Sequence, residues 1–121
     1  MTPSAQSEIF TQGLETLAED LGNGIRRKLL GYDGNILMAK VWFAQGAVGE
    51  VHTHYHSQVT YVVSGQFEVQ IDGQKKQLGE GDCFFVPPHA PHGAVCLEPG
   101  ILLDVFSPAR EDFLAYEGDA S

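Results

Sequence analysis

The amino-acid sequence predicts a single all-β domain, an antiparallel sandwich or barrel with short helical turns at its two ends. From residue 25 onward, apolar side chains alternate with polar ones. Glycine, proline or aspartate interrupts this alternation at short intervals, as expected of turns between short strands. The length of 121 residues fits one domain, which at this size buries roughly two-thirds of its extended surface, and leaves no room for a second.

Both ends of the chain are expected to carry helical turns outside the sheet. Before residue 22, apolar side chains recur at the spacing of one helical face, and Gly22-Asn23-Gly24 ends that pattern. They are Leu14, Leu17, Ala18 and Leu21. Residues 108–116 are expected to form the C-terminal turn. We therefore divide the chain into an N-terminal arm with a short helix (1–23), the β-domain (24–114) and a flexible tail (115–121).

The strands are expected to follow one another almost without interruption. Residues 25–30 alternate basic and apolar side chains, which is typical of an exposed or edge strand. Ser64-Gly65 is expected to end one strand and begin a hairpin, and Asp72-Gly73 is a strong signal for a two-residue hairpin turn. The expected strands are 25–30, 35–43, 51–56, 59–63, 66–71, 74–78, 83–86, 93–97 and 101–106.

The charge of the chain argues against several classes of partner. Sixteen acidic and seven basic side chains give a net charge of −9, so the molecule repels phosphate backbones and anionic lipid head groups. We expect no nucleic-acid partner and no membrane association. The N-terminus has neither a basic cluster nor an apolar run, and no stretch approaches the ~20 apolar residues of a membrane span. Cys83 and Cys96 lie in separate apolar segments and are expected to be buried, reduced thiols, which fits a cytoplasmic protein.

The histidines indicate a metal site. All five lie between residues 52 and 92, and three of them fall within five residues. His52 and His54 are two residues apart on an expected strand, so their imidazoles project from one face, and Gln58 keeps that parity if the strand is continuous. A further ligand is expected from the turn that carries His89 and His92. This clustering favours a metal site over hydrogen-bonded surface histidines.

Two segments of the chain resemble the two sequence motifs of the cupin family. The first runs from Gly46 to Gly65 and has Gln58 where the motif usually has glutamate. The second runs from Gly81 to Cys96 and departs from the usual residues at His89 and Cys96. The resemblance implies a cupin, a small jelly-roll β-barrel that holds a divalent metal ion. The implied ligands are His52, His54, Gln58 and His92.

The glutamine in this implied ligand set affects the chemistry of the site. A neutral amide oxygen leaves the bound ion its full charge, which makes it a stronger Lewis acid than an ion bound by a carboxylate. Such a site suits the polarisation of a substrate oxygen, and it departs from the two-histidine, one-carboxylate triad of many iron oxygenases. Three imidazoles and an amide accept nickel, zinc, iron, manganese or cobalt, so the residues do not name the ion.

The last expected strand contains one carboxylate, Asp104, in an otherwise apolar segment. An ionised aspartate there needs a partner or a special role, because burial of an unpaired charge is costly. One interpretation is an ion pair between Asp104 and Arg110 that ties the C-terminal turn to the barrel. The other is a site in which Asp104 is a general acid/base, Phe106 an aromatic platform and Arg110 an anion-binding group. The pattern alone supports both interpretations equally.

From residue 24 to 114 the chain resembles the KdgF-type cupins of pectin and alginate breakdown. The most discriminating segment runs from Leu103 to Pro108 and is followed by Arg110. The resemblance implies an isomerase- or lyase-like enzyme that converts 4,5-unsaturated monouronates, its small-molecule substrates, into linear 4-deoxy-5-keto uronates. Asp104, Phe106 and Arg110 match the catalytic positions. An anionic substrate of a protein with a charge of −9 needs local positive charge, which the metal ion and Arg110 can supply.

Two other functions are also compatible with these residues. One is a cupin dioxygenase or isomerase that acts on another small oxygenated acid; oxygen consumption would distinguish the dioxygenase. The other is a non-catalytic cupin that binds a metal or a sugar, which the lack of a second domain disfavours. We expect a homodimer, from the resemblance and because residues 25–30 can pair across a two-fold axis. His56, His89 and the first dozen residues receive no role.

Overall fold

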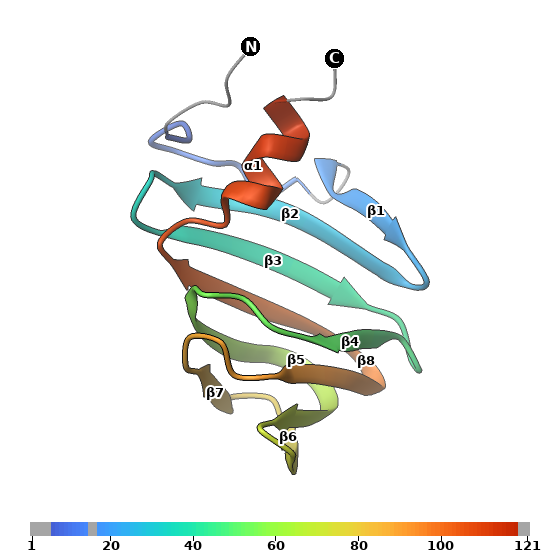
Figure 1. Cartoon of the computed structure of the whole chain (residues 1–121). Helices are drawn as coiled ribbons and strands as arrows, with labels where there is room; N and C mark the ends of the chain where they lie inside the picture. Colours follow the sequence, from blue (N-terminus) through green and yellow to red (C-terminus); the bar gives the residue numbers. More distant parts are fainter. Residues whose placement is uncertain (1–5, 15–16, 119–121) are drawn as a thin grey trace.

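The computed structural model describes residues 6–14 and 17–118 and confirms the all-β class. Within these residues, eight strands form one antiparallel sheet and one short helix follows them (Figure 1). The elements are β1 (Glu19–Gly22), β2 (Ile25–Tyr32), β3 (Leu37–Phe43), β4 (Val48–His52), β5 (Ser57–Ile71), β6 (Gln74–Gly79), β7 (Cys83–Val86), β8 (His92–Ser107) and α1 (Glu111–Gly118).

Two long strands, β5 and β8, form the centre of the sheet. The strand order is β1-β2-β3-β8-β5-β6, with β4 paired to β8 and β7 paired to β5. The second half of β8 lies between β3 and the first half of β5, where Asp104 is opposite both Ala39 and Thr60. The first half of β8 lies between β4 and the second half of β5. The two long strands therefore connect both halves of the sheet.

The sequence predicts two strands for each of these long ones, and the hairpin expected at Ser64-Gly65 is wrong. β5 runs through this dipeptide with an irregular register. Gly65 has a φ of +88°, and a Cβ added to it would lie 2.5 Å from the Cα of Gly100 on β8. The two glycines therefore allow the strands to approach closely at a bend instead of ending there. Asp72-Gly73, in contrast, forms the expected turn between β5 and β6, with both residues at positive φ.

The expected N-terminal helix is wrong for the described residues, and residues 15–16 lie outside them. Glu19–Gly22 is strand β1, which pairs with β2. Leu14 and Leu17 are 56% and 66% exposed, so the apolar spacing does not correspond to a buried helical face. A short helix needs such a face packed against the core. Backbone pairing with β2 stabilises the segment from Glu19 onward instead.

The strand β2 is not the edge strand that its alternating pattern predicts. β1 pairs with one side of it and β3 with the other. Lys28 is buried, and its Nζ donates a 3.0 Å hydrogen bond to the backbone oxygen of Gln12, so the N-terminal arm also lies against β2. β1 therefore occupies the outer backbone edge of β2 at residues 25–27.

The C-terminal helical turn is confirmed. It is α1, which continues to Gly118 and crosses β2 in Figure 1; residues 119–121 of the expected tail lie outside the described residues. Leu114 of α1 packs in a cluster with Leu37 and Phe106.

Among the residues that the structure describes, no helix is long and apolar enough to cross a membrane.

The core consists of two clusters of buried side chains. The larger cluster includes Phe67, which is fully buried and packs edge-to-face on Phe43 at a centroid distance of 5.3 Å. Cys96 belongs to the same cluster and is a free, buried thiol, as expected. Cys83 is also free but is exposed, so the expectation of two buried thiols is wrong for this residue. The smaller cluster contains Phe106 and lies next to α1.

Candidate metal centre and active site

Three histidines from separate segments meet in the folded chain. His52 ends β4, His92 begins β8, and the two are opposite each other in the sheet register. His54 lies in the connection between β4 and β5. Their ring centroids are 4.3 to 5.5 Å apart, and one nitrogen of each ring lies within 4.8 Å of the others. This spacing is compatible with binding of one metal ion by all three imidazoles.

The expected strand over residues 51–56 is wrong beyond His52, so the condition under which Gln58 would share the parity of His52 is not met. β4 ends at His52, and β5 begins only at Ser57. Gln58 nevertheless reaches the cluster, because its Oε1 lies 3.0 Å from Nε2 of His54. β4 and β5 both pair with β8. This tertiary pairing brings Gln58 close to the histidines, and the alternation of side chains along a single strand does not.

Each imidazole of the cluster is fixed through its Nδ1 atom. In His52, His54 and His92 this atom lies 2.8, 3.1 and 2.9 Å from a backbone carbonyl oxygen. A proton on Nδ1 satisfies each contact and leaves Nε2 with a free lone pair. Nε2 of His92 is buried and has no hydrogen-bond partner among the described residues. A metal ion is the partner that suits this nitrogen, since a buried polar atom without a partner is costly.

The contact between His54 and Gln58 also favours a cation. Burial lowers the pKa of His54, so its imidazole is neutral at pH 7. With the proton on Nδ1, Nε2 is an acceptor that faces the acceptor Oε1 of Gln58 at 3.0 Å. With the proton on Nε2, Nδ1 faces the carbonyl oxygen of His56 at 3.1 Å. Either neutral tautomer places two acceptors in contact, and a cation beside Nε2 and Oε1 relieves this. The residues therefore fit a metal ion.

Asp104 lies close to this cluster on β8. The hydroxyl of Thr60 donates a 2.6 Å hydrogen bond to its Oδ1, and Nε2 of Gln58 lies 3.5 Å from the same oxygen. Burial raises the pKa of Asp104, and the hydrogen bond from Thr60 offsets this only in part. A carboxyl group whose pKa is raised keeps its proton to a higher pH and can also transfer it.

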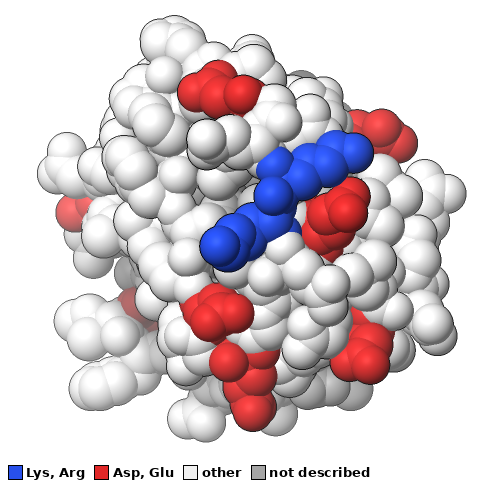
Figure 2. Space-filling model, turned by 90° about the horizontal axis from the view of Figure 1, so that it is seen from below, with Lys and Arg blue, Asp and Glu red and all other residues white. Residues whose placement is uncertain are grey.

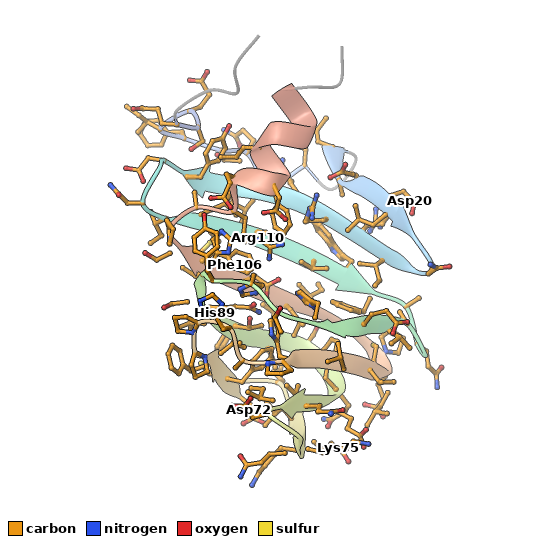
Figure 3. All side chains as sticks on the ribbon, in the orientation of Figure 1. Asp20, Asp72, Lys75, His89, Phe106 and Arg110 are labelled. Carbon is orange, nitrogen blue, oxygen red and sulfur yellow. The ribbon has the colours of Figure 1, made fainter. Side chains whose placement is uncertain are left out.

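Arg110 pairs with Asp112 and not with Asp104, so the ion-pair interpretation of Asp104 is wrong. Its Nε and Nη2 donate hydrogen bonds to the two carboxylate oxygens of Asp112 at 2.9 and 2.6 Å. Burial raises the pKa of Asp112, but the hydrogen bonds and charge of Arg110 outweigh this effect and lower it. The guanidinium also lies over the rings of Phe106 and Phe113, at 4.9 and 4.2 Å, and Figure 3 shows it beside Phe106.

The two histidines without an expected role lie outside the cluster of three. His56 is buried, with Nε2 3.0 Å from Oε1 of Glu111 in α1. The hydroxyl of Tyr55 donates to the same carboxylate, and this hydrogen bond raises the pKa of Tyr55. His89 is exposed, and its backbone N–H donates a 2.8 Å hydrogen bond to the backbone oxygen of His54. Both histidines thus hold the connection between β4 and β5 in place.

A pocket of about 230 Å³ lies beside the histidine cluster. Most of the predicted site residues line it: His52, Gln58, His92, Asp104, Phe106 and Arg110. The prediction did not single out Thr60, which holds Asp104, or Arg27 and Phe113, which also line the pocket. A signal for Arg27 was present, because it shares strand parity with apolar residues on either side.

Positive charge is scarce in this molecule. On the face shown in Figure 2, basic side chains form one narrow group and acidic side chains lie separately around it. Of the seven basic residues in the chain, Arg27 and Arg110 line the pocket. Because the net charge is −9, these two guanidinium groups are the protein's own source of local attraction for an anion at the pocket.

Comparison with known proteins agrees with this geometry. Residues 40–106 match the family described as cupin domain. The pectin degradation protein KdgF of Dickeya dadantii (strain 3937) is 46% identical over 102 residues, which cover 83% of this chain and 93% of that protein. A relative therefore matches nearly the whole described chain and not only the two motifs.

Solved structures extend the similarity to the fold. An RmlC-like cupin from Shewanella frigidimarina NCIMB 400 has a TM-score of 0.88 and 55% identity, over 91% of this chain and 99% of that one. KdgF from Halomonas sp. has a TM-score of 0.85 and 42% identity, over 89% and 100% of the two chains. The sheet of this protein is thus the cupin jelly roll, although its outer strands β1 and β6 do not pair with each other. The chain belongs to the cupin family and is a homologue of KdgF.

Proposed function

We propose that the protein is a metal-dependent enzyme that converts 4,5-unsaturated monouronates from pectin or alginate breakdown into linear 4-deoxy-5-keto uronates. The observation that carries this proposal is the placement of Asp104, a carboxyl group with a raised pKa, in the same pocket as His52 and His92. The similarity to the pectin degradation protein KdgF supports the substrate class. The volume of about 230 Å³ suits a single sugar ring better than a polymer.

The proposed cofactor is one divalent transition metal ion: nickel, zinc, iron, manganese or cobalt. His52, His54, Gln58 and His92 would hold it. When bound, it would polarise an oxygen atom of the substrate. These ligands are preorganised. The Nδ1 contacts fix the three imidazole rings, and Nε2 of Gln58 donates a 2.9 Å hydrogen bond to Thr60.

The proposed reaction is an isomerisation that needs no oxidant. The bond between C1 and the ring oxygen breaks, the hydroxyl on C1 loses a proton, and C4 gains one. Asp104 accepts the proton as a carboxylate and delivers one as a carboxylic acid, while Thr60 keeps the carboxyl group oriented. Arg110 binds the carboxylate of the substrate, and Phe106 packs against the sugar ring.

The test is the loss of ultraviolet absorbance when metal-loaded protein meets unsaturated monouronate freshly released by a polysaccharide lyase. We expect a clear acceleration over the spontaneous rate that a chelator abolishes. His92→Asn and His89→Asn form a matched pair, because only His92 belongs to the cluster and asparagine tolerates the left-handed φ of 69° at His89. His92→Asn should lose metal and activity, and His89→Asn should keep both. No acceleration by folded, metal-loaded protein would contradict the proposal.

A further inference from the structure

Arg27 is an inward-facing cation that the proposed reaction does not use. It lies in β2 opposite Val41 of β3, two residues along the strands from the register row that contains Asp104. Its neighbours of the same parity, Ile25 and Leu29, are apolar, as expected of a strand face that points toward the core. An arginine at such a position is costly to bury unless a partner satisfies it.

The partners within the described part of the chain satisfy only a part of this guanidinium. Nη2 donates a 3.1 Å hydrogen bond to Oε1 of Glu19 in β1. Nε is buried and has no hydrogen-bond partner among the described residues, and Nη1 makes no hydrogen bond to them either. The side chain is 14% exposed and lines the pocket. Arg27 therefore keeps donor capacity at the pocket wall.

Arg27 and Arg110 are held on the same aromatic ring. Their guanidinium carbons lie 3.8 and 4.2 Å from the ring centre of Phe113, so the two groups are no more than about 8 Å apart. Each also pairs with one carboxylate, Glu19 for Arg27 and Asp112 for Arg110. Two like charges at this separation repel each other, and an anion that contacts both relieves the repulsion.

We propose that Arg27 and Arg110 form a two-arginine clamp that binds the carboxylate of the substrate, with Arg27 as the specificity-determining residue that makes the pocket select acids over neutral sugars. This inference rests on the proposed function for the identity of the acid. Arg110 alone binds an anion more weakly than an unpaired arginine would, because its Nε and Nη2 already donate hydrogen bonds to Asp112. Arg27 supplies the second cation, and both guanidinium groups contact the ring of Phe113.

The test compares Arg27→Gln with Arg26→Gln. Both variants remove one positive charge from β2, but Arg26 has the opposite parity and lies beside Trp42, 5.2 Å from its ring centre. Binding of galacturonate and of galactose to the metal-free and metal-loaded protein is measured by calorimetry, next to KM and kcat for unsaturated monouronate. For Arg27→Gln we expect galacturonate affinity to fall and KM to rise by about 10- to 100-fold, the loss expected from one charge-assisted hydrogen bond. Galactose binding and kcat should change little, and Arg26→Gln should behave as wild type.

The outcomes separate this inference from the proposed function. If the wild type converts the uronate and Arg27→Gln changes only the melting temperature, the clamp is wrong and Arg27 serves its ion pair with Glu19. If the wild type shows no turnover but its galacturonate affinity depends on Arg27, the clamp stands and the proposed reaction fails. Should Arg27→Gln not fold, Arg27→Lys keeps the charge and loses the planar fork, and unchanged selectivity for acid in that variant overturns the inference.

Discussion

Replacing Asp104 with asparagine removes a charge and a proton site while keeping the shape of the side chain. Asparagine retains an oxygen that accepts the hydrogen bond from Thr60. Burial raises the pKa of Asp104 above its ordinary value of 3.8, so the folded protein binds this proton more readily than the unfolded chain. The free energy of unfolding therefore decreases as pH rises from 3.8 through the raised pKa of Asp104, and it stays lower at higher pH because the carboxylate is then ionised. Asp104→Asn is expected to leave the melting temperature unchanged or to raise it, by about 4 °C for each kcal/mol.

The expected loss of activity is large. General acid–base catalysis contributes about 10²- to 10⁴-fold in rate, which corresponds to ~3–5 kcal/mol of barrier. Among the described residues that line the pocket, Asp104 is the only carboxylate, so no neighbour replaces it. We expect kcat to fall within that range. KM should change only a few-fold, because Arg27 and Arg110 remain in place.

The assay follows substrate absorbance together with bound metal and melting temperature. Asp72→Asn is the matched control, since Asp72 lies in the hairpin turn after β5, far from Phe106 and Arg110 in Figure 3, and asparagine suits its positive φ. Retention of more than a tenth of wild-type kcat in Asp104→Asn would refute the catalytic role. A joint fall of melting temperature and metal content would instead assign Asp104 a structural role.

Three further predictions concern other groups. Burial lowers the pKa of His92 from 6.5 to about 4, so the unfolded chain takes up a proton on this residue at a higher pH than the folded protein does. The free energy of unfolding of metal-free protein, measured in urea, should therefore decrease as pH falls from 6.5 toward 4. A free energy of unfolding that does not change over this range would contradict the prediction. A thiol reagent should modify the exposed Cys83 in the native protein. It should modify Cys96 only in denaturant, because Cys96 is buried and burial raises the pKa of its thiol. Mass spectrometry shows which of the two cysteines carries the label. Glu111→Gln should lower the raised pKa of Tyr55 in an ultraviolet pH titration, and an unchanged curve would deny that contact.

Local patterns predicted the turns that depend on adjacent residues alone. Asp72-Gly73 forms its hairpin because both residues accept positive φ, a property of the dipeptide itself. Ser64-Gly65 carries a similar signal but does not end β5, because Gly100 on β8 leaves space for a bend. The outcome there depends on a residue far away in the sequence. The same holds for Glu19–Gly22, where pairing with β2 overrides the helical spacing.

In the candidate site, too, the sequence predicted some features and only the folded structure decided others. Resemblance to the cupin motifs identified His52, His54 and His92, and the cluster confirms that they meet. The argument from strand parity was wrong, since His54 lies outside any strand. The ion pair between Asp104 and Arg110 was wrong as well, because Asp112 is also close to Arg110 in sequence and only the fold decides which carboxylate pairs with it.

The sequence by itself determined the all-β class, the histidines of the candidate metal centre and the presence of one acidic residue in an apolar strand. These features depend on residue type, spacing and period over a few positions. The tertiary structure decided that β4 and β5 share β8 as a partner, that Thr60 holds Asp104, and that Arg27 and Arg110 lie on one ring. Such contacts join residues that are distant along the chain, and their energies come from burial and charge pairing, which exist only once the sheet has formed.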